Sequence, residues 1–234
     1  MEILHLTAHA TVELWIPDEE LARLPKKVGI ITTVQHLKKI DMLKEQLPDA
    51  VIGGQLLGCN ISNAQKISDA VDAFLFVGSG TFHALEVKRI TGKDVYCYDP
   101  FTQTMELLSH QAYQKDLKRK RASYTRFLSA DTIGILISTK PGQNNSKDAL
   151  YLYDHLVSES DKRCYLFIGD MLTPAEAENY PFIDCFVNTA CPRIVEDQFL
   201  RPIINYSDLV GFGYIAPRNA ATQKESRGLA SKED

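Results

Sequence analysis

Two short segments far apart in the chain each place one cysteine in a loop that directly follows an apolar run. Residues 54–60 read GQLLGCN and contain Cys59, and residues 188–194 read NTACPRI and contain Cys191. A glycine before one cysteine and a proline after the other favour an exposed turn, in which a thiolate can reach a ligand. The two cysteines are therefore a candidate pair for joint metal ligation. The alternative is that both are small core residues beside turns, because free cysteine is among the most buried residue types.

The composition is ordinary for a soluble globular protein. Of the 234 residues, 44% are hydrophobic and 24% are charged, which is enough for the core of one large or two small domains. A net charge of −4 argues against a general nucleic-acid binder. No apolar run could cross a bilayer, and the first residues lack the pattern of a signal peptide. Five dispersed cysteines fit a reducing cytosol, so we expect a cytoplasmic protein with no membrane and no direct nucleic-acid partner.

Apolar strand patterns alternate with helical patterns along most of the chain. The run VGIITTV at 28–34 is continuous and β-branched, as a strand covered on both faces requires. Strands separated by helices imply parallel βαβ units, so the predicted fold class is α/β with two tandem small parallel-sheet domains. Further strands are expected to end at 54 and to span 73–77, 94–98, 132–139, 164–168, 185–188 and 202–205, with helices at 37–47, 63–69, 82–90, 113–128, 147–157 and from 173 onward.

These patterns divide the chain into regions. Residues 16–117 are expected to form an α/β domain that carries Cys59, and residues 118–212 a second one that carries Cys191. Residues 213–234 are polar and are expected to form a disordered tail. The basic run at 115–121 is expected to be a solvated helix face rather than a binding site.

Several polar loops follow predicted strands, at the edge of a parallel sheet where ligands bind. The GSG segment at 78–80 lies between a strand and a helix, where backbone N–H groups can approach an anionic ligand, although a tight turn alone also explains its glycines. His83 and His36 are as readily explained by capping or packing. Asp99 either begins a turn or offers a carboxylate to a ribose or an ammonium group.

The remaining cysteines are less suited to a site. Cys164 and Cys185 begin predicted strands, at the end opposite the polar loops, and are expected to be core residues. Cys97 lies at the carboxyl end of its strand, two residues before Asp99, and is a reserve ligand.

Taken together, the segments GQLLGCN, FLFVGSGTFH, the Asp-Pro pair after the next strand, STKPGQ and DCFVNTACPRI resemble, in this order, the diphthamide synthase family. The similarity extends to about residue 210. Members of this family are atypical radical S-adenosylmethionine proteins that begin diphthamide biosynthesis in archaea and eukaryotes.

The resemblance implies three homologous α/β domains, each of which donates one cysteine to a 4Fe–4S cluster that binds S-adenosylmethionine. The family generates a 3-amino-3-carboxypropyl radical, which adds to a histidine of translation elongation factor 2 and leaves methylthioadenosine. Cys59 and Cys191 match the cysteines of the second and third domains, and no catalytic residue is expected beyond these ligands. Motif match and strand-end position together predict the following cofactor-binding residues: Gln55, Gly78, Ser79, Gly80, His83, Asp99 and Gln143.

The chain departs from the family pattern at its start. Residues 1–15 resemble the last strand and exit loop of the first domain, or a linker, so the domain that supplies the first ligand is expected to be absent. Two thiolates are few for a cluster that usually has three or four. The missing ligand could come from a first-domain or homologous subunit, from a second copy of this chain in a homodimer, or from Cys97. The chain could also have lost the cluster.

Two classes of function remain open at this point. The first is an iron–sulfur transferase of 3-amino-3-carboxypropyl groups that needs a partner and an external electron donor. The second is a non-catalytic partner or scaffold subunit, or a module that binds S-adenosylmethionine or a nucleoside without the cluster. The persistence of both cysteines within intact motifs favours the enzyme.

Overall fold

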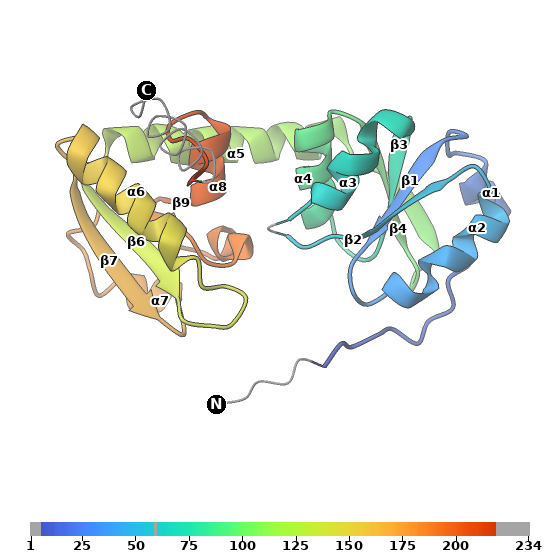
Figure 1. Ribbon diagram of the computed structural model, residues 1–234, viewed down its shortest axis with the longest axis horizontal. Coiled ribbons are helices and arrows are strands. Elements are labelled where there is room, and N and C mark those ends of the chain that lie inside the picture. Colours follow the sequence, from blue (N-terminus) through green and yellow to red (C-terminus); the bar gives the residue numbers. More distant parts are fainter. Residues whose placement is uncertain (1–5, 59, 219–234) are drawn as a thin grey trace, which may run out of the picture. The chain divides into compact units, whose positions relative to one another are not determined.

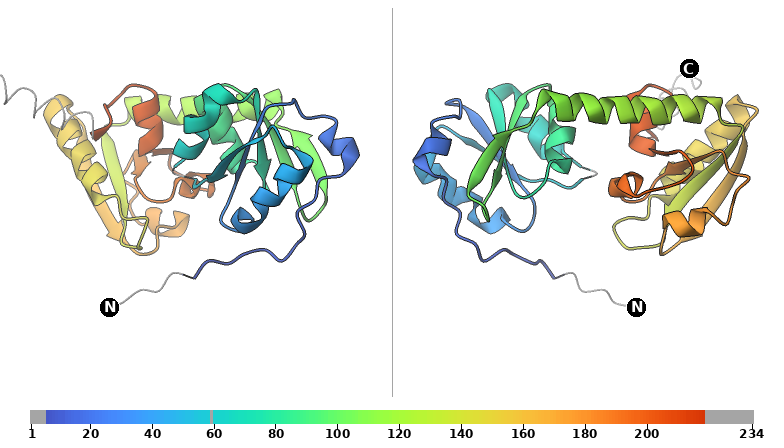
Figure 2. Two further views of the ribbon diagram at one scale, coloured as in Figure 1. Left: turned by 45° about the vertical axis from the view of Figure 1, so that its right-hand side comes forward. Right: turned by 180° about the vertical axis from the view of Figure 1, so that it is seen from behind.

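The computed structural model describes residues 6–58 and 60–218, which belong to two compact units, Met1–Asp116 and Leu117–Asp234. Each unit has its own β-sheet with helices packed against it (Figures 1 and 2). The α/β fold class predicted from the alternation of strands and helices is confirmed.

The sheet of the first unit has the strand order β2-β1-β3-β4-β5. Its strands are β1 (Val28–Thr32), β2 (Val51–Gln55), β3 (Ala73–Val77), β4 (Asp94–Asp99) and β5 (Thr104–Leu107). Strands β1 to β4 pair in parallel. Every residue of β1 and β3 is buried, as expected for central strands covered on both faces.

Strand β5 was not expected, and it makes this sheet mixed rather than purely parallel. It pairs antiparallel with β4 after a tight turn in which the backbone N–H of Gln103 donates to the carbonyl of Asp99. Only Met105 of its four residues is buried, so the segment lacks the apolar run that marks a strand. A short edge strand of this kind is specified by its turn and its partner rather than by its own pattern.

The helices of the first unit lie on both faces of its sheet. They are α1 (Asp18–Leu21), the 3₁₀ helix η1 (Leu37–Met42), α2 (Leu43–Gln46), α3 (Ser62–Ile67), the 3₁₀ helix η2 (Ser68–Ala70) and α4 (Phe82–Thr91). The single helix expected at 37–47 is therefore a 3₁₀ helix followed by one α-helical turn. Its buried residues Ile40 and Leu43 still occupy the apolar positions that predicted it.

The second unit contains a four-stranded parallel sheet with the order β7-β6-β8-β9. Its elements are α5 (His110–Ser129, which begins in the first unit), β6 (Thr132–Ser138), α6 (Ser146–Glu159), β7 (Arg163–Gly169), α7 (Pro174–Ala177), β8 (Cys185–Asn188), the 3₁₀ helix η3 (Pro192–Glu196), β9 (Ile203–Asn205) and α8 (Tyr206–Gly211). All seven residues of β6 are buried, which makes it the central strand of the core.

Both ends of the described chain pack against these units. Leu14 and Ile16 are buried in a core cluster of the first unit, and the hydroxyl of Tyr98 donates to the carbonyl of Trp15. Ile215 is buried in the second unit, so the packed structure extends past the expected boundary at 212. The remainder of the expected tail, 219–234, lies outside the described residues.

None of the helices in the described part of the chain is long and apolar enough to cross a membrane.

Candidate functional site

In the first unit, the structure brings together Ser79 and Asp99 at the carboxyl ends of β3 and β4. The Ser79 hydroxyl donates to Oδ2 of Asp99 at 2.8 Å, and the backbone N–H of Phe101 donates to Oδ1 at 2.9 Å. Two donors thus fix the orientation of the Asp99 carboxylate. Gly78 and Gly80 have φ values of 150° and 76°, so the loop between β3 and α4 takes a path that favours glycine.

His83 lies in the first turn of α4 and packs among aromatic side chains. Its ring stacks on Phe76 with centroids 5.6 Å apart, and the ring of Phe82 meets it edge-on at 5.4 Å. His83 thus packs between aromatic rings, and its role in cofactor binding stays a prediction. Gln55 is the last residue of β2, and its carbonyl accepts a hydrogen bond from the side chain of Asn63 at 2.8 Å.

His36 was set aside as a packing residue, and the structure gives it a more unusual environment. The side chain is 1% exposed, and its Nδ1 has no hydrogen-bond partner among the described residues. Burial lowers the pKa of His36 below its usual 6.5, and the negative charge of Asp99 partly opposes this effect. The edge of the ring faces Phe101, with centroids 6.1 Å apart. The sequence signal for this environment was the position of His36, four residues after the end of the buried strand β1.

Cys59 lies outside the described residues, and the residues on either side of it form the following contacts. Leu57 and Asn60 exchange two backbone hydrogen bonds of 3.0 and 2.9 Å, and the side chain of Asn60 accepts from the backbone of Ser62. A Cβ added to Gly58 would lie 2.5 Å from the ring of Phe82. The first residue of α4 thus packs directly against the glycine that precedes Cys59.

Cys191 lies in the second unit, at the start of η3 and three residues after the end of β8. Its side chain is half-buried, so the thiol is neither enclosed in the core nor freely projecting. Its carbonyl accepts a hydrogen bond from the Asn188 side chain at 2.9 Å and another from the backbone N–H of Ile194 at 3.1 Å. Two hydrogen bonds to the backbone carbonyl of Cys191 therefore hold the loop in place.

Two buried asparagines form the centre of this support, which we call the asparagine clamp (Asn188 and Asn205). They are register partners on β8 and β9, and their side chains hydrogen-bond to each other at 2.7 Å. Asn188 also accepts from the backbone of Ala190, and Asn205 donates to the carbonyl of Pro192. The clamp thus holds the residue before Cys191 and the residue after it.

Thr189 anchors the same loop to the sheet. Its hydroxyl donates to the carbonyl of Leu136 on β6 at 2.7 Å, and its own carbonyl accepts from the Asn145 side chain at 2.7 Å. None of these polar side chains was predicted from the sequence to support the loop. The available signal was that two apolar strands, 185–187 and 203–204, both end in asparagine.

Gln143, the last predicted cofactor residue, also belongs to the second unit. Its backbone N–H donates to the carbonyl of Lys140, and Gly142 before it has a φ of 76°. It therefore ends a tight turn after β6, as its Pro-Gly sequence suggested. The other predicted cofactor residues, Gln55, Gly78, Ser79, Gly80, His83 and Asp99, all belong to the first unit.

Burial changes the acidity of the other cysteines. Burial raises the pKa of Cys97 to about 11, with a further contribution from Glu106, and burial raises the pKa of Cys185 to about 12. The pKa of Cys164 is also raised by burial. Such thiols stay protonated near neutral pH in the metal-free protein, and Cys97 as a reserve ligand stays a prediction. Among the described residues, no three His, Cys, Asp or Glu side chains form a group that could hold a metal ion.

Known proteins resemble this chain over most of its length. The family model described as "Putative diphthamide synthesis protein" matches residues 8–210. A 2-(3-amino-3-carboxypropyl)histidine synthase from Pyrococcus horikoshii is 28% identical over 193 residues, which cover 77% of this chain and 54% of the relative. Subunit 1 of the synthase of the same name from Encephalitozoon cuniculi is 30% identical over 196 residues, covering 76% and 54%. This chain thus spans about half the length of these curated relatives.

A solved structure has the same fold. The crystal structure of Dph2 from Pyrococcus horikoshii with a 4Fe–4S cluster superposes with a TM-score of 0.73 at 24% identity, and the match covers 85% of this chain and 60% of that chain. The resemblance inferred from the sequence motifs is thereby confirmed: the chain belongs to the family of diphthamide synthesis proteins.

Proposed function

We propose that this chain is a diphthamide-synthase-type iron–sulfur protein that acts in the first step of diphthamide biosynthesis. The observation that carries the proposal is Cys191, whose half-buried thiol lies at a strand end in a loop held by the asparagine clamp. A core cysteine needs no such support, since apolar packing alone would place it. A thiolate ligand does need it, because the position of its sulfur must be maintained against solvent and oxidants.

Cys59 and Cys191 are the proposed ligands of a 4Fe–4S cluster. The donor chemistry fits, because thiolates are the usual ligands of such clusters. When bound and reduced, the cluster supplies the electron that cleaves S-adenosylmethionine. Two thiolates are fewer than the usual set, so the proposal includes a partner that completes the ligands, either a homologous subunit or a second copy of this chain.

The residues at the strand ends of the first unit have a proposed role in binding S-adenosylmethionine. The Asp99 carboxylate, fixed by Ser79 and the backbone of Phe101, is oriented to accept hydrogen bonds from hydroxyl or ammonium groups. The glycines of the 78–80 loop allow a ligand to approach the backbone closely. Gln55, His83 and Gln143 complete the proposed set of cofactor contacts.

The proposed reaction transfers the 3-amino-3-carboxypropyl group, as a radical, from the sulfonium of S-adenosylmethionine to a histidine ring carbon of translation elongation factor 2. One electron breaks the carbon–sulfur bond and releases methylthioadenosine and the radical. The radical forms the carbon–carbon bond with the ring carbon, and the ring then loses the hydrogen of that carbon as a proton and gives one electron back, so the transfer is redox-neutral overall. An external electron donor starts the reaction, and the reducing cytosol is the proposed setting. The residues of this chain contribute ligation, orientation of the cofactor and protection of the site from water.

The test is anaerobic reconstitution with iron and sulfide, followed by measurement of iron and labile sulfide per chain. We expect cluster content to be lost in Cys59→Ala and in Cys191→Ala and to be retained in the matched control Cys97→Ala. Conversion of S-adenosylmethionine to methylthioadenosine and modification of elongation factor 2 are then measured with the same set of variants.

The outcomes separate the alternatives. A cluster that forms only after a homologous subunit is added establishes the shared site. Unchanged iron content in Cys191→Ala would contradict the ligand assignment. No cluster under any condition would overturn the enzymatic proposal and leave a scaffold subunit or a module that binds the nucleoside alone.

A further inference from the structure

A cavity of about 180 Å³ lies wholly within the second unit, beneath α5. One wall is a face of α5 on which Arg119, Ser123 and Arg126 follow the i, i+4, i+7 spacing that places side chains on the same side of a helix. The opposite wall is the segment 195–205, which leads into β9. In the described sheet β9 is the outermost strand, so its outer edge borders the cavity rather than another strand.

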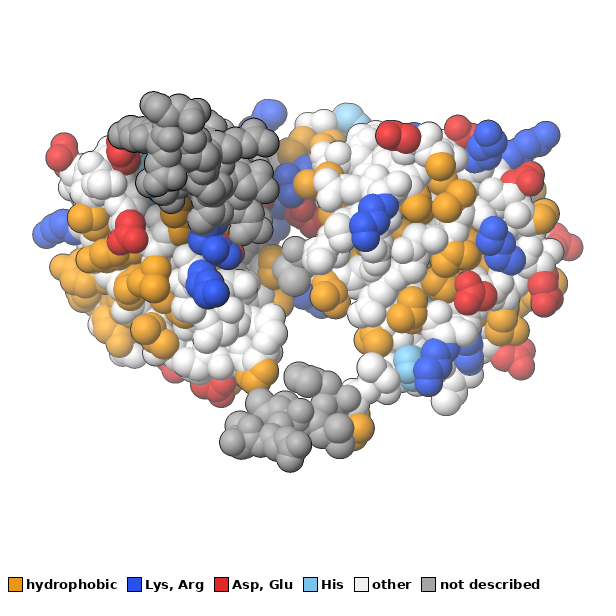
Figure 3. Space-filling view, viewed as in Figure 1, with side chains coloured by type: hydrophobic (Ala, Val, Ile, Leu, Met, Phe, Trp, Pro, Cys, Tyr) orange, Lys and Arg blue, Asp and Glu red, His pale blue; other side chains and the backbone are white. Residues whose placement is uncertain are grey.

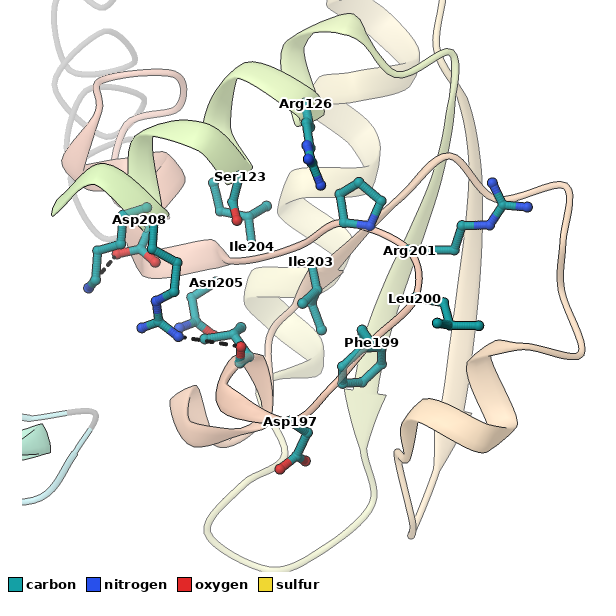
Figure 4. Close-up of a pocket in the computed structure, with 14 residues that line it drawn as sticks. Ser123, Arg126, Asp197, Phe199, Leu200, Arg201, Ile203, Ile204, Asn205 and Asp208 are labelled. Atoms are coloured by element: carbon teal, nitrogen blue, oxygen red, sulfur yellow. Dashed lines mark hydrogen bonds and ion pairs between the residues drawn. The ribbon is translucent and has the colours of Figure 1, made fainter. Parts of the chain in front are cut away.

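The polar groups of this cavity are mainly cationic. Lys120 and Asp208 are both buried and pair with each other at 2.9 Å, so their charges offset one another. Three arginines and one further acid, Asp197, make up the other charged lining residues. In Figure 4 the Arg126 and Ser123 side chains extend from α5 toward Ile203 and Ile204, whereas Asp197 lies at the far end of the cavity.

The other two arginines are less available than Arg126. Arg119 donates to the carbonyl of Val195, and Arg201 donates to the carbonyl of Pro181. Both keep their positive charge, because a guanidinium group is not deprotonated in proteins. The buried pair Lys120–Asp208 was not expected, because the run 115–121 was predicted to be only a solvated helix face. Part of that run lines a cavity instead.

The size and chemistry of this space favour a small anion. Its volume is below the roughly 300–1,000 Å³ of pockets that enclose whole drug-sized ligands. Guanidinium groups bind phosphate oxygens through paired, charge-assisted hydrogen bonds, and a serine hydroxyl adds a neutral donor. We infer that this cavity binds a phosphate group, either as the free ion or as the terminal monoester of a small molecule.

Such a ligand would lie next to the support of Cys191. Asn205 lines the cavity and also belongs to the asparagine clamp, where it bonds to Asn188 and to the carbonyl of Pro192. On the other side of the cavity, Val195 is the second-last residue of η3, and Asp197 directly follows that helix. Phosphate binding is therefore expected to restrain the loop that begins at Cys191.

The test uses the full chain without iron or S-adenosylmethionine, titrated with inorganic phosphate or with ribose 5-phosphate at a constant 150 mM ionic strength and followed by calorimetry. We expect saturable binding of at least one of the two, which also identifies the source of the phosphate. Arg126→Glu should weaken binding by about tenfold or more. Arg121→Glu is the matched control, because Arg121 is exposed on the same helix and does not line the cavity.

Arg126→Gln is measured beside the charge reversal, and circular dichroism establishes that both variants are folded. The inference is wrong if neither compound binds saturably to the wild-type chain, or if Arg121→Glu and Arg126→Glu weaken binding equally. Because the assay needs neither cluster nor cofactor, its failure leaves the proposed function standing, and failure of a cluster to form under any condition leaves the phosphate site standing.

Discussion

The loops around the two candidate ligands both follow parallel strands, β2 and β8, yet they are stabilised in different ways. The loop that contains Cys191 is held by side chains, chiefly the buried asparagine clamp. The residues that flank Cys59 are held by backbone bonds between Leu57 and Asn60 and by contact of Gly58 with Phe82.

Because the supports differ, the two loops are expected to be sensitive to different kinds of substitution. Buried amides that satisfy several backbone groups are expensive to remove, because each lost partner leaves a buried polar atom without a hydrogen bond. A glycine beneath an aromatic ring is sensitive instead to added volume. The loops around Cys59 and Cys191 are therefore expected to tolerate different substitutions, although each carries a candidate ligand.

The largest expected effect separates loop cysteines from strand cysteines. At pH 8 a thiol with a pKa of about 11, like that of Cys97, is ionised in roughly one molecule per thousand, and Cys185 at about 12 is ionised still less. Alkylation of the iron-free protein with iodoacetamide should therefore modify Cys97 and Cys185 at least about a hundredfold more slowly than an unperturbed thiol, and more slowly than the loop cysteines Cys191 and Cys59, as peptide mass spectrometry would show. If Cys59 reacts as slowly as Cys185, the comparison between the two loops fails.

The next effect tests the asparagine clamp. Asn188→Ala removes the bond to Asn205 and leaves the carbonyl of Cys191 and the N–H of Ala190 without the Asn188 side chain as a partner. We therefore expect the free energy of unfolding, measured in urea, to fall by about 3 kcal/mol. The variant should also lower iron retention after reconstitution. Asn144→Ala is the control, because Asn144 is exposed and makes one local bond, and its loss should be below about 1 kcal/mol. Equal losses would show that the clamp has no special role.

A smaller effect is expected in the first unit, at Gly58. A methyl group there would meet the ring of Phe82 at 2.5 Å, so Gly58→Ala should lower the free energy of unfolding by about 1–2 kcal/mol. The double variant with Phe82→Ala should recover part of this loss, because the obstructing ring is gone. A double-mutant cycle measures the recovery. Strictly additive losses would mean that the contact with Phe82 does not shape this loop.

The sequence predicted the strands well and the supports of the site poorly, for a physical reason. Burial on both faces imposes a continuous apolar run, which is visible in β1, β3 and β6 without any knowledge of neighbours. Asn188 and Asn205 are 17 positions apart, and Lys120 and Asp208 are 88 positions apart. No local sequence pattern could therefore predict these two contacts. Cys59 and Cys191 were singled out as candidate ligands because the glycine and proline beside them are local signals, and their role stays a prediction. Strand β5 was missed because its pairing with β4, rather than its own sequence, makes it a strand.

The smallest effect concerns pH, and it arises in the first unit because the asparagine clamp contains no titratable side chain. Burial lowers the pKa of His36 in the folded state below the usual 6.5, so the unfolded chain binds a proton first as the pH falls. The stability that depends on neutral His36 is complete above about pH 6.5 and decreases as the pH falls toward the folded-state pKa. The effect is small because the charge of Asp99 opposes that of burial.

His36→Gln should therefore reduce the drop in urea midpoint between pH 7.5 and 5.5, whereas Asn188→Ala should lower the midpoint equally at both. An acid dependence that is unchanged in His36→Gln would show that other groups cause it. If instead Asn188→Ala alters the pH dependence, the two strand-end regions are coupled. The contrast between the titratable His36 in the first unit and the uncharged asparagine clamp in the second would then be wrong.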